Sequence, residues 1–175
     1  MRLNGILLAA AAALMAPAQA AADVVSSTPT GFHIRHSVPV AATKARAFAL
    51  LTEPRLWWAD AHTYSGDAAN FRMDVAPGGC FCESWDAGFV KHMEVVAANP
   101  GTQIILSGGL GPLRYAPADG TMVWEIVEAR DGVRLVIDYK VVGFPASDAQ
   151  QIAPVVDGVL GDLAARFAAR AAQAN

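Results

Sequence analysis

The chain has 175 residues, of which 54% are hydrophobic and 17% are charged, and its formal net charge is −3. This length suits one domain with a sizeable core, and this composition excludes a disordered chain. The basic residues are scattered and form no run. Because binding to phosphates requires a concentrated basic surface, we expect no nucleic-acid partner.

The first twenty residues have the layout of a signal peptide. Arg2 supplies a positive start, residues 6–15 form an apolar run, and small residues precede the expected cleavage after Ala20 or Ala22. A helix over that run would be about 15 Å long, half the thickness of a bilayer core, so we expect no stable membrane span after cleavage. The sequence therefore predicts a signal peptide at residues 1–20 and a periplasmic or secreted protein.

Residues 21–30 are small and polar and include a proline, which is typical of a linker. The folded domain is then expected to occupy residues 31–175. Alternation of apolar and polar residues within residues 31–39 predicts the first strand of this domain. One face of that strand is formed by Phe32, Ile34 and His36.

Two short helices and a series of strands are expected to follow. Helical spacing in residues 40–59 predicts the helices, the second beginning at Pro54. The apolar runs after them are separated by Gly, Pro and Asp, which are typical of turns. Consecutive strands with short turns must pair antiparallel. The strand candidates are residues 71–75, 80–85, 89–97, 103–107, 121–128 and 133–142.

The C-terminal segment predicts one long helix. Ser147 and Gln150 fit a capping box, and Pro154 is expected to begin or kink the helix. Asp157 falls outside the apolar stripe. The order of elements predicts an α+β fold in which a curved antiparallel sheet of about six to seven strands wraps the long helix. The stripe consists of Ile152, Val155, Val156, Val159, Leu160, Leu163 and Phe167.

Several strings in this order carry a family resemblance. They are residues 38–40 (VPV) with the helix after them, 57–60 (WWAD), 77–81 (PGGCF), 108–113 (GGLGPL) and the terminal helix from Ile152. Residues 31–175 as a whole resemble the START-like (SRPBCC) superfamily with its helix-grip fold, and most closely the branch of Hsp90-ATPase-activator homologues and polyketide cyclases. The resemblance implies a sheet gripping the helix around an apolar cavity that binds lipids, polyketides or other apolar molecules. It implies no shared catalytic residue.

Aromatic residues are the first candidates for the cavity wall. Each has two interpretations, core packing or contact with a ligand that has an apolar body and a polar edge. As neighbours on a helix, Trp57 and Trp58 are not expected to point inward together. His62 and Tyr64, in the loop after them, lie either at the cavity mouth or on an ordinary surface loop. The aromatic candidates are Trp57, Trp58, Trp85, Trp124 and Tyr139.

The two cysteines, Cys80 and Cys82, lie two residues apart on a strand candidate. In a regular strand their Cα atoms would be about 6.6 Å apart, at the far limit of the ~4.4–6.8 Å that a disulfide spans. A bulge would shorten this separation. Buried thiols are therefore the first expectation, with a disulfide in an oxidising compartment or a metal or redox role as alternatives.

His92 is the polar residue whose partner depends on strand register. A three-residue loop would pair Trp85 with Phe89 and place His92 opposite Cys82, in a cluster suited to a soft metal. A two-residue loop would place His92 opposite Glu83, as a carboxylate–imidazole pair suited to acid–base chemistry. A hydrogen-bonded or solvated histidine without a special role is the third interpretation. One residue of slip thus decides between the first two, and the turn residues 86–88 (DAG), with Gly in the left-handed position, fit the three-residue loop better.

We therefore expect an exported START-like protein that binds a small hydrophobic or amphipathic ligand between the sheet and the C-terminal helix. His92, Glu83, His62 and Tyr64 are the polar residues expected to orient the ligand. The alternative is a cyclase-, aromatase- or dehydratase-type enzyme acting on a polyketide-like substrate, with His92 and a carboxylate in the cavity. A protein–protein interaction module with a filled core is the third class. No metal or cofactor is expected, and the catalytic residues are unknown.

Overall fold

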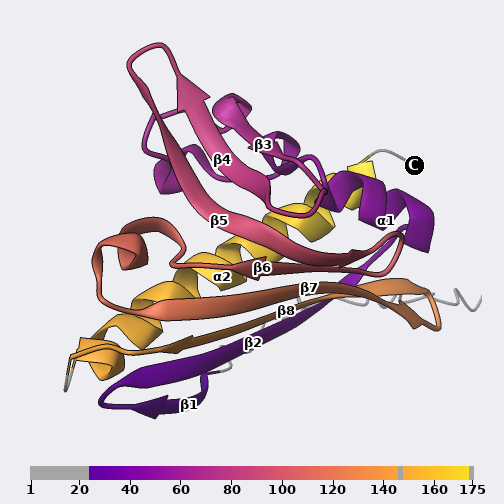
Figure 1. Ribbon diagram of the computed structural model, residues 1–175. Helices are drawn as coiled ribbons and strands as arrows, with labels where there is room; N and C mark the ends of the chain where they lie inside the picture. Colours follow the sequence, from indigo (N-terminus) through magenta and orange to yellow (C-terminus); the bar gives the residue numbers. More distant parts are fainter. Residues whose placement is uncertain (1–23, 146–147, 174–175) are drawn as a thin grey trace, which may run out of the picture.

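An eight-stranded antiparallel sheet curves around one long helix in the computed structural model, which describes residues 24–145 and 148–173 (Figure 1). The predicted α+β fold is therefore confirmed, and the expected signal peptide lies outside the described residues. The strand order is β1-β2-β8-β7-β6-β5-β4-β3, so β2 and β8, far apart in sequence, are neighbours. The elements are β1 (Val24–Thr28), β2 (Gly31–Val40), α1 (Lys44–Leu51), β3 (Phe71–Met73), β4 (Gly79–Trp85), β5 (Gly88–Asn99), β6 (Gln103–Ser107), β7 (Asp119–Ala129), β8 (Gly132–Val142) and α2 (Asp148–Gln173).

Strand β1 corrects the expectation of a linker at residues 21–30. It pairs antiparallel with β2 at the edge of the sheet, and all five of its residues are exposed. Because neither face of β1 is buried, its sequence carries no apolar alternation, and Ser and Thr are compatible with a solvated edge strand. The sheet therefore has one strand more than the expected maximum of seven.

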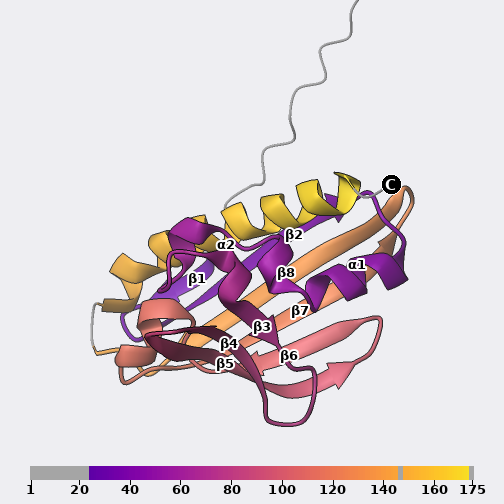
Figure 2. The same cartoon turned by 90° about the horizontal axis from the view of Figure 1, so that it is seen from above.

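Strand β2 shows the expected alternation. Phe32, Ile34 and His36 are buried, whereas Arg35 and Ser37 between and after them are exposed. The ladder from β2 to β8 is continuous along the whole strand. This long pairing gives α2 a continuous sheet face to pack against (Figure 2).

Trp57 and Trp58 are both buried, which corrects the expectation that they diverge. Helix α1 ends at Leu51, and a single 3₁₀ turn, Pro54–Leu56, precedes the two tryptophans. The backbone at Trp57 is not helical, with φ of −141°, so the geometric restriction on helical neighbours does not apply. Each indole N–H has a partner, because Trp57 donates to the carbonyl of Leu50 at 2.9 Å and Trp58 donates to that of His62 at 3.0 Å.

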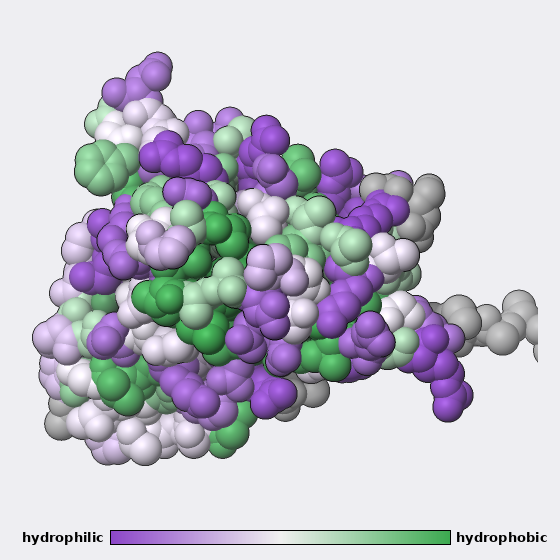
Figure 3. Space-filling view, turned by 45° about the vertical axis from the view of Figure 1, so that its right-hand side comes forward, coloured by the Kyte–Doolittle hydropathy of each residue, from purple (hydrophilic) through white to green (hydrophobic). Residues whose placement is uncertain are grey.

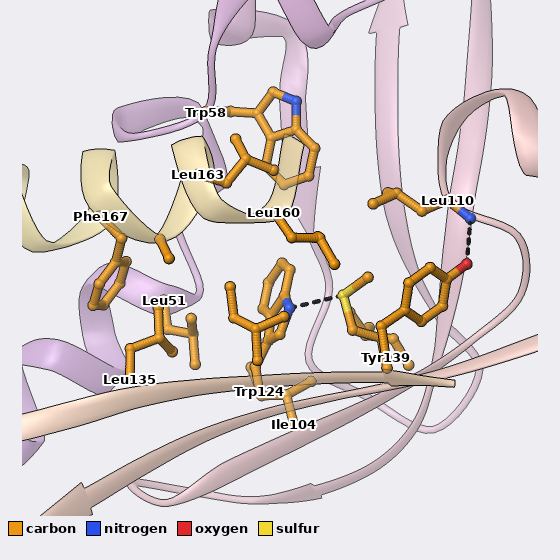
Figure 4. Close-up of a cluster of buried hydrophobic side chains, with 14 of the residues drawn as sticks. Leu51, Trp58, Ile104, Leu110, Trp124, Leu135, Tyr139, Leu160, Leu163 and Phe167 are labelled. Atoms are coloured by element: carbon orange, nitrogen blue, oxygen red, sulfur yellow. Dashed lines mark hydrogen bonds between the residues drawn. The ribbon is translucent and has the colours of Figure 1, made fainter. Parts of the chain in front are cut away.

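Helix α2 starts at Asp148 and continues through Pro154, so the proline lies inside the helix and does not begin it. Ser147, and with it the expected capping box, lies outside the described residues. The helix packs small residues and a few large ones against the sheet, around the central indole of Trp124 (Figure 4). Its buried apolar residues are Ala149, Ala153, Leu160, Leu163, Ala164, Phe167 and Ala171.

The surface mixes apolar and polar residues, and Figure 3 shows one face on which apolar residues are surrounded by hydrophilic ones. Among the described residues, neither helix has the length and apolar character that a membrane crossing requires.

Candidate functional site

A cavity of about 340 Å³ lies beside the first half of α2. One wall is the loop that carries the 3₁₀ turn Asp60–His62, and another is the 3₁₀ turn Gly111–Tyr115 between β6 and β7. The helix contributes a row of branched side chains to the third wall: Ile152, Val155, Val156 and Val159. The walls are therefore mainly apolar, as in pockets that bind small organic molecules.

Tyr139 holds the segment between β6 and β7, which forms one wall of the cavity, by hydrogen bonds to its backbone. Its hydroxyl accepts a hydrogen bond from the backbone N–H of Leu110 at 3.0 Å (Figure 4). It donates another to the carbonyl of Gly108 at 3.2 Å. Burial raises the pKa of Tyr139 to about 12, so the phenol stays protonated at neutral pH. Leu110 and Leu113 are in this way held in the cavity wall, while Tyr139 itself does not line the cavity.

The register of β4 against β5 differs from both predicted registers. Trp85 pairs with Gly88 and Glu83 with Val90, but beyond a shift in register Phe81 pairs with Met93. His92 is the extra residue of this β-bulge and has no residue directly opposite it. The bulge rather than the turn therefore decides which side chains His92 meets.

The bulge brings His92 onto Glu83, as the two-residue loop was expected to do. Nε2 of His92 lies 3.2 Å from Oε2 of Glu83, and both side chains are buried, with His92 3% and Glu83 0% exposed. Glu83 also accepts hydrogen bonds from the backbone N–H groups of Tyr64, at 3.0 Å, and Ser65. One carboxylate thus anchors both the imidazole and the loop that carries Tyr64.

Burial and hydrogen bonding set the charges of this pair. Burial alone raises the pKa of Glu83, but hydrogen bonds from Ser65, Tyr64 and His92 outweigh it and lower the pKa below the ordinary value. Burial lowers the pKa of His92, and the attraction of Glu83 offsets this only in part. At neutral pH the site therefore holds a carboxylate hydrogen-bonded to a neutral imidazole.

Four predicted residues line the cavity, namely Trp58, His62, Tyr64 and His92. Glu83 does not line it, but it hydrogen-bonds His92 and the backbone of Tyr64. Tyr64 is 39% exposed, and burial, followed by the influence of Tyr115, raises the pKa of its hydroxyl. Nε2 of His62 lies 3.8 Å from Oδ2 of Asp162 on α2. The structure therefore brings these four predicted residues together around one cavity.

The other aromatic candidates do not line the cavity. The ring of Trp57 packs against Trp124 and Phe167, with centroids 5.5 and 5.4 Å away. Trp124 is buried in the core, and its indole N–H lies 2.9 Å from the sulfur of Met122. Trp85 lies at the turn between β4 and β5 and is half-buried. Trp57 and Trp124 fill part of the interior that the resemblance implied to be open, and the cavity lies beside the first half of α2.

The structure adds lining residues that sequence reasoning did not single out as ligand contacts. Ile152, Val155, Val156 and Val159 belong to the predicted apolar stripe and also line the cavity. Val155 is 60% exposed, which places it at the cavity mouth. The predicted stripe is wide enough to contain two rows of side chains, so its width could have indicated that one of these rows lines a cavity.

Cys80 and Cys82 are joined in a disulfide, which corrects the first expectation of buried thiols. Their Cα atoms are 5.3 Å apart, closer than in a regular strand, and the register of β4 against β5 shifts between them. The alternative of a Cys–His metal cluster is not realised, because the cysteines bond each other and His92 bonds Glu83. Over residues 24–145 and 148–173 no group of three or more His, Cys, Asp or Glu side chains is arranged to hold a metal ion.

Comparison with known proteins shows the fold but no family. No family model matches the chain, and no curated protein matches it. The solved structures that resemble it include an uncharacterised protein from Rhizobium leguminosarum, with a TM-score of 0.54 and 18% identity over 78% of this chain and 94% of that one. The di-domain ARO/CYC StfQ of the steffimycin biosynthetic pathway gives a TM-score of 0.56 and 14% identity over 83% of this chain and 52% of its own.

DynU16, from the dynemicin biosynthetic locus, also resembles the chain, with a TM-score of 0.50 and 19% identity over 76% of this chain and 46% of its own. The chain thus spans about half the length of these two biosynthetic proteins. At these identities the similarity shows the fold alone.

Proposed function

We propose that the protein binds a small hydrophobic or amphipathic molecule in the cavity beside α2. The observation that carries this proposal is the cavity itself, about 340 Å³ in volume, with apolar walls and a few polar groups at His62, Tyr64 and His92. Its volume lies within the range of about 300–1,000 Å³ that is usual for small-molecule sites. Burial of apolar surface supplies affinity, at ~25 cal/mol per Å², and the polar groups orient the ligand.

The fold supports this proposal independently of the cavity. Structures with the same fold include StfQ, whose name assigns it to the aromatase/cyclases, and a protein of a second biosynthetic locus. The sequence strings that resemble polyketide cyclases and Hsp90-ATPase-activator homologues agree with a START-like assignment. Both considerations favour an organic ligand over an interaction module with a solid core.

The test is to ask whether a molecule co-purifies from the native host and whether the cavity holds it. Val156→Trp adds a large ring to the helical wall, whereas Ala165→Trp adds the same ring at an exposed position of α2. Native mass spectrometry should find a bound organic molecule in the wild type and in Ala165→Trp but not in Val156→Trp. Recovery of nothing from any of them, or of the same molecule from all three, would refute the proposal.

A second candidate is an enzyme of the cyclase, aromatase or dehydratase type. The observation that favours it is the neutral His92, which a buried carboxylate orients in the cavity wall, an arrangement suited to a general base. A linear poly-β-carbonyl substrate should then be converted by the wild type and not by His92→Phe, as followed by mass spectrometry of the products. Binding of the substrate without turnover would favour the simple binding protein.

We also propose that the chain is exported. The disulfide Cys80–Cys82 supports an oxidising compartment, because thiols are kept reduced in most cytosols. The intact mass of protein from the native host should correspond to cleavage after Ala20 or Ala22. Recovery of the full-length chain from the cytosolic fraction would contradict this.

A further inference from the structure

We infer that the cavity selects a neutral ligand with a hydroxyl group, because the ring of His92 offers that group a hydrogen-bond acceptor and no donor. The inference rests on the proposed binding function and narrows its ligand class to phenols and alcohols with an apolar body. It follows from three features of the Glu83–His92 pair.

The first feature is that Glu83 acts only as an acceptor. Its carboxylate already receives the backbone N–H groups of Tyr64 and Ser65, which a protonated carboxyl would do less well. Oε2 of this carboxylate lies 3.2 Å from Nε2 of His92. An ionised carboxylate has no proton to donate, so Nε2 of His92 must carry the hydrogen.

The second feature is the state of the other ring nitrogen. A neutral imidazole carries one N–H, and here Nε2 uses it, so Nδ1 presents a lone pair. Nδ1 is buried and has no hydrogen-bond partner among the described residues. Buried acceptors without partners are uncommon in folded proteins and are unfavourable, so a ligand that donates to Nδ1 gains the full value of that bond.

The third feature is the setting of the ring. His92 belongs to the cavity wall, and the ring of Tyr64, with its centroid 5.9 Å away, is a partly exposed neighbour of it. Phe71 stacks on the ring with centroids 4.8 Å apart, which fixes its plane. A slim hydroxyl group fits against a nearly covered nitrogen better than a branched polar group does.

The same features disfavour other polar groups. A carboxylate has no hydrogen to donate to Nδ1, and the negative charge of Glu83 behind the ring repels it. An ether or ketone oxygen is only an acceptor, so its lone pairs would face the lone pair of Nδ1 and no hydrogen bond could form. A cation that could attract a carboxylate instead is Arg114. Its Nη1 is also buried without a hydrogen-bond partner among the described residues, but Arg114 does not line the cavity. If Arg114 rather than His92 contacted the polar group of the ligand, carboxylates would bind most tightly.

Four matched probes distinguish these cases: 2-naphthol, 2-methoxynaphthalene, naphthalene and 2-naphthoate, each titrated calorimetrically against the full chain at pH 7. We expect 2-naphthol to bind about ten-fold more tightly than its methyl ether, the effect of one buried hydrogen bond. His92→Phe should bring the two affinities together. Val159→Ala, which trims the apolar wall, should weaken both probes alike and serves as the matched control.

A second readout does not depend on the variant folding. Nitrogen NMR of the wild-type imidazole should show the hydrogen of His92 on Nε2 and an unprotonated Nδ1 at pH 7. A hydrogen on Nδ1 would overturn the inference. So would equal binding of 2-naphthol and its ether, or preference for 2-naphthoate, and either result would leave the proposed binding function standing. Failure of all four probes to bind would overturn both.

Discussion

Nε2 of His36, on β2, lies 2.9 Å from Oδ1 of Asp157, on α2, and both side chains are buried. The distance is that of an ion pair, although the angles are not those of a hydrogen bond. Gly161, one turn further along the helix, leaves room for the ring, since a Cβ there would lie 3.1 Å from Cε1 of His36. The pair links the helix to the sheet next to the residues that line the cavity.

Removal of either partner of this pair should therefore destabilise the fold. A polar group left alone in the interior is costly, and we expect His36→Ala and Asp157→Ala each to lower the free energy of unfolding by about 3 kcal/mol. The double variant should be less damaged than the sum of the two, because it leaves no group unpaired. Urea denaturation of the four proteins measures the coupling, and strict additivity would contradict an interaction between the two side chains.

The Glu83–His92 pair predicts a loss of stability in acid in two steps. The pKa of His92 is lower in the folded protein than its ordinary 6.5, so below pH 6.5 the unfolded chain takes up the proton first and stability falls. The pKa of Glu83 is likewise lower than 4.5, so a second loss begins below pH 4.5. The positive charge of Arg114 also lowers the pKa of His92, as burial does.

Urea midpoints measured from pH 7 to pH 3.5 test this sign. His92→Gln should flatten the first step and leave the second, whereas Glu83→Gln should flatten the second. Both variants are expected to be less stable than the wild type at pH 7, because each removes one partner of a buried hydrogen bond. A wild-type midpoint that does not change between pH 7 and pH 5 would contradict the lowered pKa of His92.

The sequence was sufficient for the fold but not for the position of His92. The six strand candidates and the long helix correspond to observed elements, because alternation, turn residues and an apolar stripe are local signals. A β-bulge has no such signal, since one extra residue in β5 changes the partner of His92 without changing the pattern around it. The contact with Glu83 corresponds to only one of the two alternatives left open by the sequence, and the strands adopt neither of the two registers from which those alternatives follow.

Asp157 and the adjacent Trp57 and Trp58 also take positions that the local sequence pattern does not predict. Asp157 falls outside the predicted apolar stripe, yet it is buried opposite a histidine. The sequence predicts Trp57 and Trp58 as helical neighbours, yet the chain there forms only a single 3₁₀ turn before them and both rings are buried. In each case a tertiary partner decided the position of a side chain, and such partners are not visible in a local pattern.

The disulfide between Cys80 and Cys82 should contribute little to stability. It closes a very short loop, and the chain-entropy estimate for such a loop is about 1.5 kcal/mol or less. The double variant Cys80→Ser/Cys82→Ser should therefore fold and unfold at a urea concentration close to that of the wild type. Thiol titration of the denatured, unreduced wild type should find no free thiol, and two free thiols would contradict the bridge.

Tyr139 offers a test of how the cavity wall is held. Tyr139→Phe removes the hydroxyl that bonds Leu110 and Gly108, so we expect the free energy of unfolding to fall by about 1–3 kcal/mol. Ligand affinity should fall as well, because Leu110 and Leu113 lose their anchor. Tyr115→Phe, at an exposed ring, is the control and should change stability by less than about 0.5 kcal/mol.

The high pKa of Tyr139 adds an alkaline signature to the same variant. The phenol ionises near pH 10 in the unfolded chain but only near about 12 in the folded protein, so the unfolded chain loses its proton first and wild-type stability falls as the pH rises through this interval. Tyr139→Phe should lack this component, and its urea midpoint should depend less on pH above 10. Parallel curves for the two proteins would show that the buried hydroxyl does not hold the wall as the structure indicates.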